Sequence, residues 1–74
     1  MEQEIIDFKK GIGKNVRSYR MKRGLTQGDL AKLTNCRQDV LSGIENGKRG
    51  IQIIRLYELA RVLKVKPYQL LVIK

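Results

Sequence analysis

Residues 24 to 48, GLTQGDLAKLTNCRQDVLSGIENGK, contain two short amphipathic segments separated only by the stretch TNC. Two helices joined by so short a turn must cross steeply, and their backbones approach closely near it. Ala31 lies where a larger side chain would strike the next helix, and Asn35 suits the left-handed backbone that the turn needs. The segment predicts two steeply crossed helices over about residues 26–46, locked together by Leu30, Cys36, Leu41 and Ile44.

The boundaries of these two helices are marked by capping residues. Thr26 followed by Asp29 has the spacing of a capping box, in which each side chain bonds the other residue's backbone N–H. The second helix, at about 38–46, is expected to stop at Asn46-Gly47. The inward residues of the two helices are expected to be Leu30, Ala31, Leu33, Val40, Leu41 and Ile44.

Apolar residues at helical spacing predict three further helices. The first can be capped by Asp7 and runs to about Arg23, where Gly24 suits a left-handed end. Another is expected at roughly 53–63, and Pro67 suits the first turn of the last. The sequence therefore predicts one all-α domain of five helices over residues 1–74, whose other inward residues are Phe8, Ile12, Val16, Tyr19, Ile53, Leu56, Leu59, Ala60, Leu63, Leu70 and Leu71.

The chain is strongly basic. Its 16 Lys and Arg against 7 Asp and Glu give a net charge of +9 and a pI near 10.1. Between residues 9 and 24 there are seven cations and no anion. Such an excess attracts polyanions, either nucleic acid or an anionic membrane surface, although a solubilising surface has the same composition.

The residue types that the sequence lacks exclude several kinds of site. There is no histidine, and Cys36 is the only cysteine, so an internal disulfide and a Cys/His metal site are both excluded. No nucleophile–base pair can be assembled locally, and we expect neither an enzyme nor a cofactor. No apolar run approaches the roughly 18 residues of a membrane span, and the acidic start MEQEIIDF is unlike a secretory signal. We therefore expect a cytoplasmic protein, with Cys36 as a small buried hydrophobe rather than a redox switch.

The outward side of the second short helix differs from an ordinary solvated surface. At about 100° per residue, Gln38, Ser42 and Asn46 point nearly opposite to its apolar residues, with Asp39 and Gly43 beside them. These side chains are short, polar and nearly uncharged, unlike the Glu/Lys mixture of a typical surface helix. Because Gln and Asn suit the edge of adenine and a helix fits the major groove, this face predicts base reading. The alternative is a plain solvated helix.

Residues 12–71 resemble the helix-turn-helix domain of phage repressors and Cro proteins, the Xre-type regulators. IGKNVRSYRMKRGLTQGDLA is similar to the family's first two helices, VLSGIENGKRG to its recognition helix and following loop, and LYELARVLKVKPYQLL to its last two helices. The resemblance implies a lambda-repressor-like fold and a sequence-specific regulator of transcription that binds double-stranded DNA. The helix at about 38–46 is then expected in the major groove.

The resemblance also implies roles for single residues. Gln27 matches a glutamine whose side chain meets a DNA phosphate, and Arg20 and Glu45 match a partly buried ion pair. The base-facing positions are Gln38, Asp39 and Gly43, with Arg37 just before the helix; the loop that grips the DNA backbone contributes Asn46, Lys48 and Arg49.

The sequence departs from the family pattern at several of these positions. Arg37 stands where Ser or Thr often caps the recognition helix, and it is expected to reach a guanine or a phosphate instead. Gly43 removes a side chain that the family often uses for base contact. Asp39 has two readings, since it could accept from a cytosine amine or only favour the helix N-terminus. Thr34 is polar where the family usually buries an apolar side chain.

We expect the protein to act as a homodimer on a near-palindromic operator, because one recognition helix covers only a few base pairs. The candidate surface is the apolar end of the chain, with folding of these residues into the core as the alternative: Leu70, Leu71, Val72 and Ile73. No separate ligand-sensing domain is expected, so regulation would follow the protein's own concentration, as in Cro-like repressors or restriction–modification controller proteins. The alternative function is an antitoxin that binds a protein partner as well as its own operator.

Overall fold

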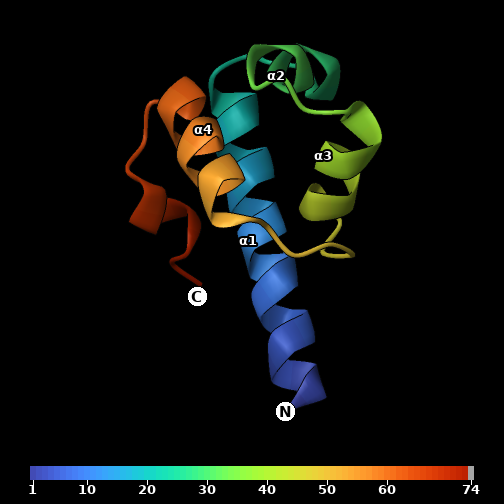
Figure 1. The fold of residues 1–74 in the computed structure, drawn as a ribbon. Coiled ribbons are helices and arrows are strands. Elements are labelled where there is room, and N and C mark those ends of the chain that lie inside the picture. The colour runs from blue at the N-terminus through green and yellow to red at the C-terminus, as the bar shows by residue number, and fades with distance from the viewer. Residues whose placement is uncertain (74) are drawn as a thin grey trace.

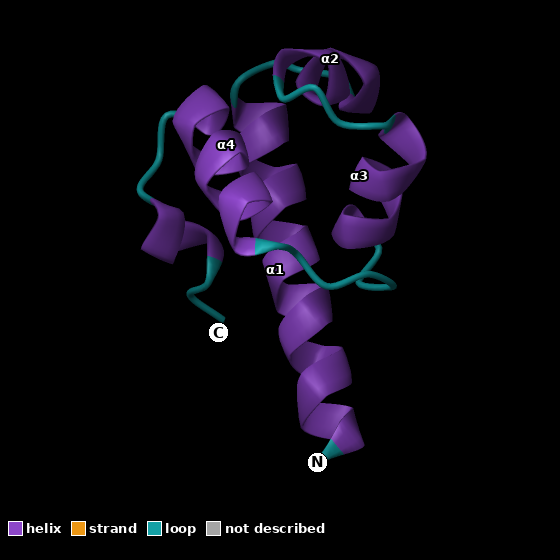
Figure 2. Cartoon of the chain, viewed as in Figure 1, coloured by secondary structure: helices purple, strands orange, loops and turns teal. Residues whose placement is uncertain are grey.

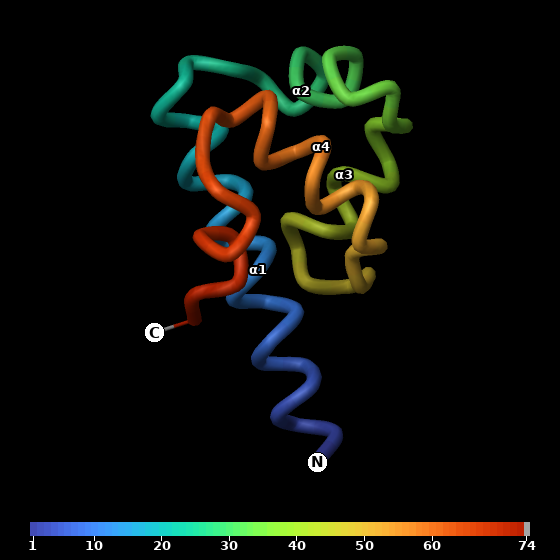
Figure 3. The backbone as a smooth tube through the Cα atoms, turned by 60° about the vertical axis from the view of Figure 1, so that its left-hand side comes forward, coloured from blue at the N-terminus to red at the C-terminus, as the bar shows by residue number. Residues whose placement is uncertain are grey.

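Five helical elements follow one another in the computed structural model, which describes residues 1–73 (Figures 1 and 2). They are α1 (Glu2–Lys22), α2 (Gln27–Leu33), α3 (Gln38–Glu45), α4 (Ile53–Leu63) and a short 3-10 helix, η1 (Pro67–Leu70). α1 contacts α3, α4 and η1, and its first turns project beyond the other elements (Figures 1 and 3). The predicted all-α fold is confirmed for these residues.

α1 is longer than the sequence predicted. It begins at Glu2 rather than Asp7, because Glu2 and Glu4 in its first turn suit the positive end of the helix dipole. Asp7 therefore lies inside the helix, where its Oδ1 accepts a hydrogen bond from Gln3 Nε2 at 2.9 Å. The expectation that Phe8 packs in the core is wrong: it is about half exposed, because this part of α1 projects beyond the other elements.

The turn between α1 and α2, and the turn between α2 and α3, have the predicted backbone. The N–H of Asp29 donates to Thr26 Oγ1 and the N–H of Thr26 to Asp29 Oδ2, both at 3.0 Å, which completes the capping box. The backbone hydrogen bond from Thr26 lowers the pKa of the Asp29 carboxyl. Asn35 has a φ of 50° and Gly24 a φ of 69°, so both adopt the left-handed conformation expected of them. These two turns set the entry and exit of α2.

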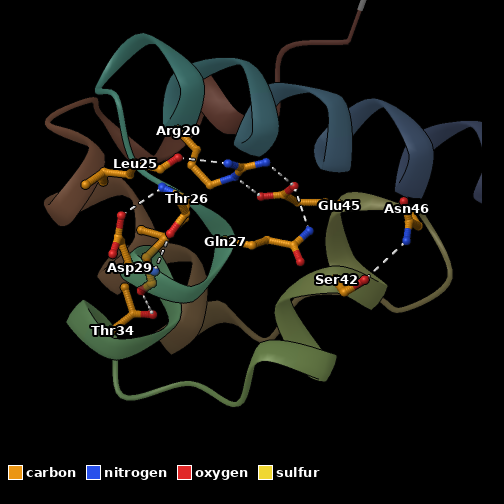
Figure 4. Close-up of polar contacts among 10 residues, drawn as sticks. Arg20, Leu25, Thr26, Gln27, Asp29, Thr34, Ser42, Glu45 and Asn46 are labelled. Atoms are coloured by element: carbon orange, nitrogen blue, oxygen red, sulfur yellow. Dashed lines mark hydrogen bonds and ion pairs between the residues drawn. The ribbon is translucent and has the colours of Figure 1, made fainter.

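The inward position near the end of α2 is Thr34, and the prediction that Leu33 faces inward is wrong. Leu33 is 57% exposed, whereas Thr34 is 4% exposed. At about 100° per residue, Thr34 points between the directions of the buried Leu30 and Ala31. Leu33 points about 110° away from the direction midway between those two residues. Thr34 tolerates burial because its Oγ1 donates to Leu30 O at 2.8 Å, so the hydroxyl is bonded (Figure 4).

The core collects aliphatic side chains from all five elements. Cys36 is half-buried against it, and Ile53, expected inside, is largely exposed because it lies in the first turn of α4. The expected fifth α-helix is the single 3-10 turn of η1, with Leu70 fully buried and Leu71 partly exposed. The buried apolar residues are Ile12, Val16, Leu30, Ala31, Leu41, Ile44, Leu56, Leu59, Ala60, Leu63 and Leu70.

Gly13 allows α1 and α3 to pack closely. A Cβ placed on Gly13 would overlap the carbonyl oxygens of Ile44 and Glu45, so no larger residue fits without moving the end of α3. A glycine within a helix lowers helix stability by roughly 0.5–1 kcal/mol relative to alanine. The close approach offsets this loss, because it brings the end of α3 against α1.

An ion pair between Arg20 and Glu45 fixes the end of α3 against α1. Arg20 Nε donates to Glu45 Oε2 at 2.7 Å and Arg20 Nη2 to Glu45 Oε1 at 3.0 Å (Figure 4). Arg20 Nη1 also donates to Leu25 O at 2.8 Å, and Gln27 Nε2 donates to Glu45 Oε1 at 3.1 Å. The side chains of Arg20 and Glu45 are only 12% and 2% exposed. The pair therefore links α1, α2 and α3 in a place that water scarcely reaches.

We expect Arg20→Leu and Glu45→Leu each to lower the free energy of unfolding by about 3–5 kcal/mol, because each leaves a buried charge without its partner. The double variant is expected to lose much less than the sum of the two. Urea denaturation of the four proteins measures this coupling. A matched cycle at Arg37 and Asp39, whose paired side chains are 81% and 59% exposed, should give a coupling of about 0–1 kcal/mol. Coupling at Arg20 and Glu45 no larger than in that control would contradict the structural role of the pair.

Candidate nucleic-acid interface

α3 lies at an edge of the molecule and has one buried and one open side (Figure 1). Its buried side, Leu41, Ile44 and Glu45, packs against α1 and α2. On the open side the predicted residues follow one another along the helix, with Ser42 and Gly43 half-buried and the others exposed: Gln38, Asp39, Ser42, Gly43 and Asn46. The side chains expected to face DNA therefore share one open surface.

At the start of α3, Arg37 and Asp39 contact each other. Arg37 precedes the helix with an extended backbone and makes no side-chain capping bond, as its side chain has no acceptor oxygen. Its Nη2 donates to Asp39 Oδ2 at 3.1 Å in a solvent-exposed pair. Because an exposed pair is worth about 0–1 kcal/mol, both side chains remain free to rearrange toward another ligand.

Gln38 presents an amide that no protein group binds within the described residues. Its Oε1 lies beside Gly28 of α2, where an added Cβ would come within 3.5 Å of it. The small residue on α2 thus leaves room for the Gln38 side chain between the starts of the two helices. An amide with both donor and acceptor unbound suits a bidentate contact with a base edge.

Gln27 is held by a hydrogen bond within the protein. It is half-buried, and its Nε2 donates to Glu45 Oε1, so that its amide also belongs to the ion-pair cluster (Figure 4). Its side chain therefore connects the start of α2 with the buried Arg20–Glu45 pair.

The loop after α3 folds back over the last turn of the helix. Gly47 has a φ of 73°, and the backbone N–H groups of Lys48 and Arg49 donate to Gly43 O at 2.9 and 3.2 Å. Asn46 Nδ2 donates to Ser42 Oγ at 3.3 Å (Figure 4). The exposed cations of the loop thus lie beside the outward side of α3.

Two features of this surface escaped sequence reasoning. The side chain of Arg49 crosses the place where Gly43 has no Cβ, with Arg49 Cδ 2.8 Å from the position that a Cβ would occupy. The bond between Gln27 and Glu45 joins residues 18 positions apart. Helical spacing within one segment carries no signal for either contact.

The basic residues of α1 are distributed over several surfaces. Arg20 is in the buried pair, whereas Lys10, Lys14 and Lys22 line a groove between α1 and the C-terminal segment. That segment lies across α1 from α3 (Figures 1 and 3). Among the described residues, no group of His, Cys, Asp and Glu could hold a metal ion, and no helix is long and apolar enough to cross a membrane.

Several known proteins resemble this chain in sequence or in fold. A helix-turn-helix family model, HTH_3, matches residues 16–70. An uncharacterized HTH-type transcriptional regulator, y4dJ, from Sinorhizobium fredii is 37% identical over 65 residues, which are 88% of this chain and 84% of that protein. The restriction-modification controller protein C.AhdI from Aeromonas hydrophila has a TM-score of 0.81 at 29% identity, covering 84% of this chain and 94% of that one.

A structure of SinR, the master regulator for biofilm formation, in complex with DNA has a TM-score of 0.78 at 31% identity. The match covers 82% of this chain and 98% of the SinR chain in that structure. The family model spans the Arg20–Glu45 pair, the crossed helices α2 and α3, and the core of α4 and η1. The chain therefore belongs to the HTH_3 family of helix-turn-helix proteins.

Proposed function

We infer that this protein is a DNA-binding regulator of transcription that inserts α3 into the major groove of a specific double-stranded site. The observation that carries this function is the open side of α3, where uncharged polar side chains stand next to the exposed cations of the following loop. Polar groups with free donors and acceptors read base edges, and the flanking cations bind phosphates. The SinR complex with DNA supports this reading.

The roles of the contact residues follow from their positions. We assign base reading to Gln38, whose amide is unbound, with Ser42, Asn46 and the exposed Arg37–Asp39 pair beside it. We assign phosphate contact to Lys48, and to the free atoms of the Gln27 amide at the start of α2. The assignment separates residues that determine sequence preference from residues that add affinity for any duplex.

The named relatives are described as a transcriptional regulator, a controller protein and a master regulator, which favours regulation over an antitoxin role. In the proposal the protein works in the cytoplasm and responds to its own concentration, as a controller protein or a Cro-like repressor would. Selection of bound duplexes from a random pool tests the function directly. Enrichment of one motif is expected, and a pool that stays random would contradict sequence-specific binding.

We also propose that the protein binds its operator as a homodimer through the end of the chain. Asn15 Nδ2 donates to Leu70 O and Val72 O at 2.9 and 2.8 Å, which fastens this segment to α1. Leu70 is fully buried and belongs to the core, so it takes no part in the surface. The residues that remain are partly exposed: Leu71 at 37%, Val72 at 48% and Ile73 at 39%.

The surface of α1 extends this apolar patch. Ile73 packs where Gly11 has no side chain, and Phe8 lies one turn before Gly11 with about half of its surface exposed. A partner copy would cover these apolar groups. Two recognition helices about one turn of DNA apart, roughly 34 Å, would then read a near-palindromic operator.

The first prediction here separates base reading from phosphate contact. Gln38→Ala is expected to weaken binding to the selected site by about 1–3 kcal/mol and to relax the preference at one base pair. Lys48→Ala is expected to weaken all duplexes similarly and to reduce the salt slope by about one. Titrations of both variants on selected and scrambled duplexes at several salt concentrations measure these effects. Equal losses for Gln38→Ala on every duplex would show that α3 docks differently.

The second prediction concerns the dimer. The double variant Val72→Asp/Ile73→Asp is expected to be a folded monomer that binds half-sites weakly, because the buried charges oppose association. Sedimentation, with thermal melting to verify folding, compares it with the parent. Leu33→Asp is the control, since Leu33 is also an exposed apolar residue, at 57%, but lies on α2, away from the C-terminal segment. A parent that is monomeric at tens of micromolar, both free and on its selected site, would exclude the dimer but not DNA binding.

A further inference from the structure

Arg49 occupies the surface of α3 that Gly43 leaves bare. A Cβ built on Gly43 would lie 2.9 Å from Arg49 Cγ, 2.8 Å from Cδ and 3.2 Å from Nε. The contact involves the middle of the arginine side chain and not its mobile end. The Arg49 stem is therefore seated on the helix at Gly43, and a larger residue at position 43 would force this stem to shift.

The backbone holds Arg49 at this place. Its N–H donates to Gly43 O at 3.2 Å, the neighbouring N–H of Lys48 donates to the same oxygen at 2.9 Å, and the left-handed Gly47 turns the chain back toward the helix. Since Gly43 and Arg49 belong to one hydrogen-bonded turn, local structure fixes the backbone from which the Arg49 side chain starts.

Gly43 lies on the side of α3 that is proposed to enter the groove. On a helix it stands one turn after Asp39 and nearly one turn before Asn46, both of which are exposed. The Arg49 guanidinium follows directly after the seated stem, and within the described residues no protein group binds it. A guanidinium without a protein partner thus lies beside Gly43 on the open side of α3.

We propose that Arg49 determines specificity, and that its guanidinium donates to O6 and N7 of a guanine in each half-site. This inference rests on the proposed DNA-binding function. Gly43 and Arg49 act together in it: the glycine leaves the space in which the Arg49 side chain lies, and the arginine provides the hydrogen-bond donors. A planar guanidinium with parallel N–H groups matches the two acceptors of guanine in the major groove. Arg49 then replaces the base-contacting side chain that position 43 lacks.

The test uses the intact protein and the duplex selected from a random pool, with every base pair of one half-site varied in turn. Arg49→Ala is expected to lose about 5- to 150-fold in affinity for the selected duplex, which corresponds to one bidentate base contact. The same variant is expected to lose almost nothing on the duplex whose recognised G·C pair is replaced. Arg49→Lys is expected to lose nearly as much as alanine, because an ammonium keeps the charge but not the fork of donors.

Gly43→Ala tests the seat independently of the charge. It is expected to relax the preference at the same base pair as Arg49→Ala, while its melting temperature stays equal to that of the parent or rises, since alanine favours helix. Lys48→Ala is the matched control, with a similar loss on every duplex. A uniform loss for Arg49→Ala that lysine restores, or an unchanged base preference in Gly43→Ala, would overturn the proposal. Failure of the parent to enrich any motif would instead contradict DNA recognition itself.

Discussion

The buried carboxylate of Glu45 is the constraint on which the placement of the recognition helix depends. It accepts hydrogen bonds from Arg20 of α1 and from Gln27 of α2, and Arg20 also binds Leu25 O in the loop between those helices. A charge buried this deeply is tolerated only while its partners satisfy it, so departures from this geometry are strongly unfavourable. The end of α3 is therefore held by a bonded network in addition to apolar packing.

Close packing makes this network possible. The missing side chain of Gly13 lets the end of α3 approach α1, and Arg20 lies two turns further along the same side of α1. Gly43 lies on the open side of α3, where its missing side chain leaves room for the aliphatic part of Arg49. A glycine lowers the stability of an isolated helix. At both positions, however, a larger side chain would overlap the group that packs there. A rigid α3 suits base reading, because side chains must reach base edges within a narrow tolerance.

Net charge favoured a polyanionic partner, either nucleic acid or an anionic membrane surface, but did not indicate which surface would meet it. The cations between residues 9 and 24 look alike in the sequence. In the structure Arg20 is buried in an ion pair, whereas Lys14 and Lys22 line a groove on the far side of α1 from α3. The cations beside α3 come instead from Lys48 and Arg49 in the loop. Counting charges could not separate these groups; only the family resemblance singled out Arg20, Lys48 and Arg49.

The sequence by itself determined the local features: the four α-helices, the Thr26 cap and the left-handed turn at Asn35. These depend on hydrogen bonds and backbone preferences within a few residues, which a sequence pattern contains. Tertiary structure alone decided that Gly13 of α1 meets the end of α3, and that Gln27 joins the Arg20–Glu45 pair. It also decided that Phe8, on the projecting start of α1, stays outside the core. Those outcomes depend on which helix surfaces pack against each other. Such contacts join residues whose separation in the sequence follows no helical or strand period, so a sequence pattern does not reveal them.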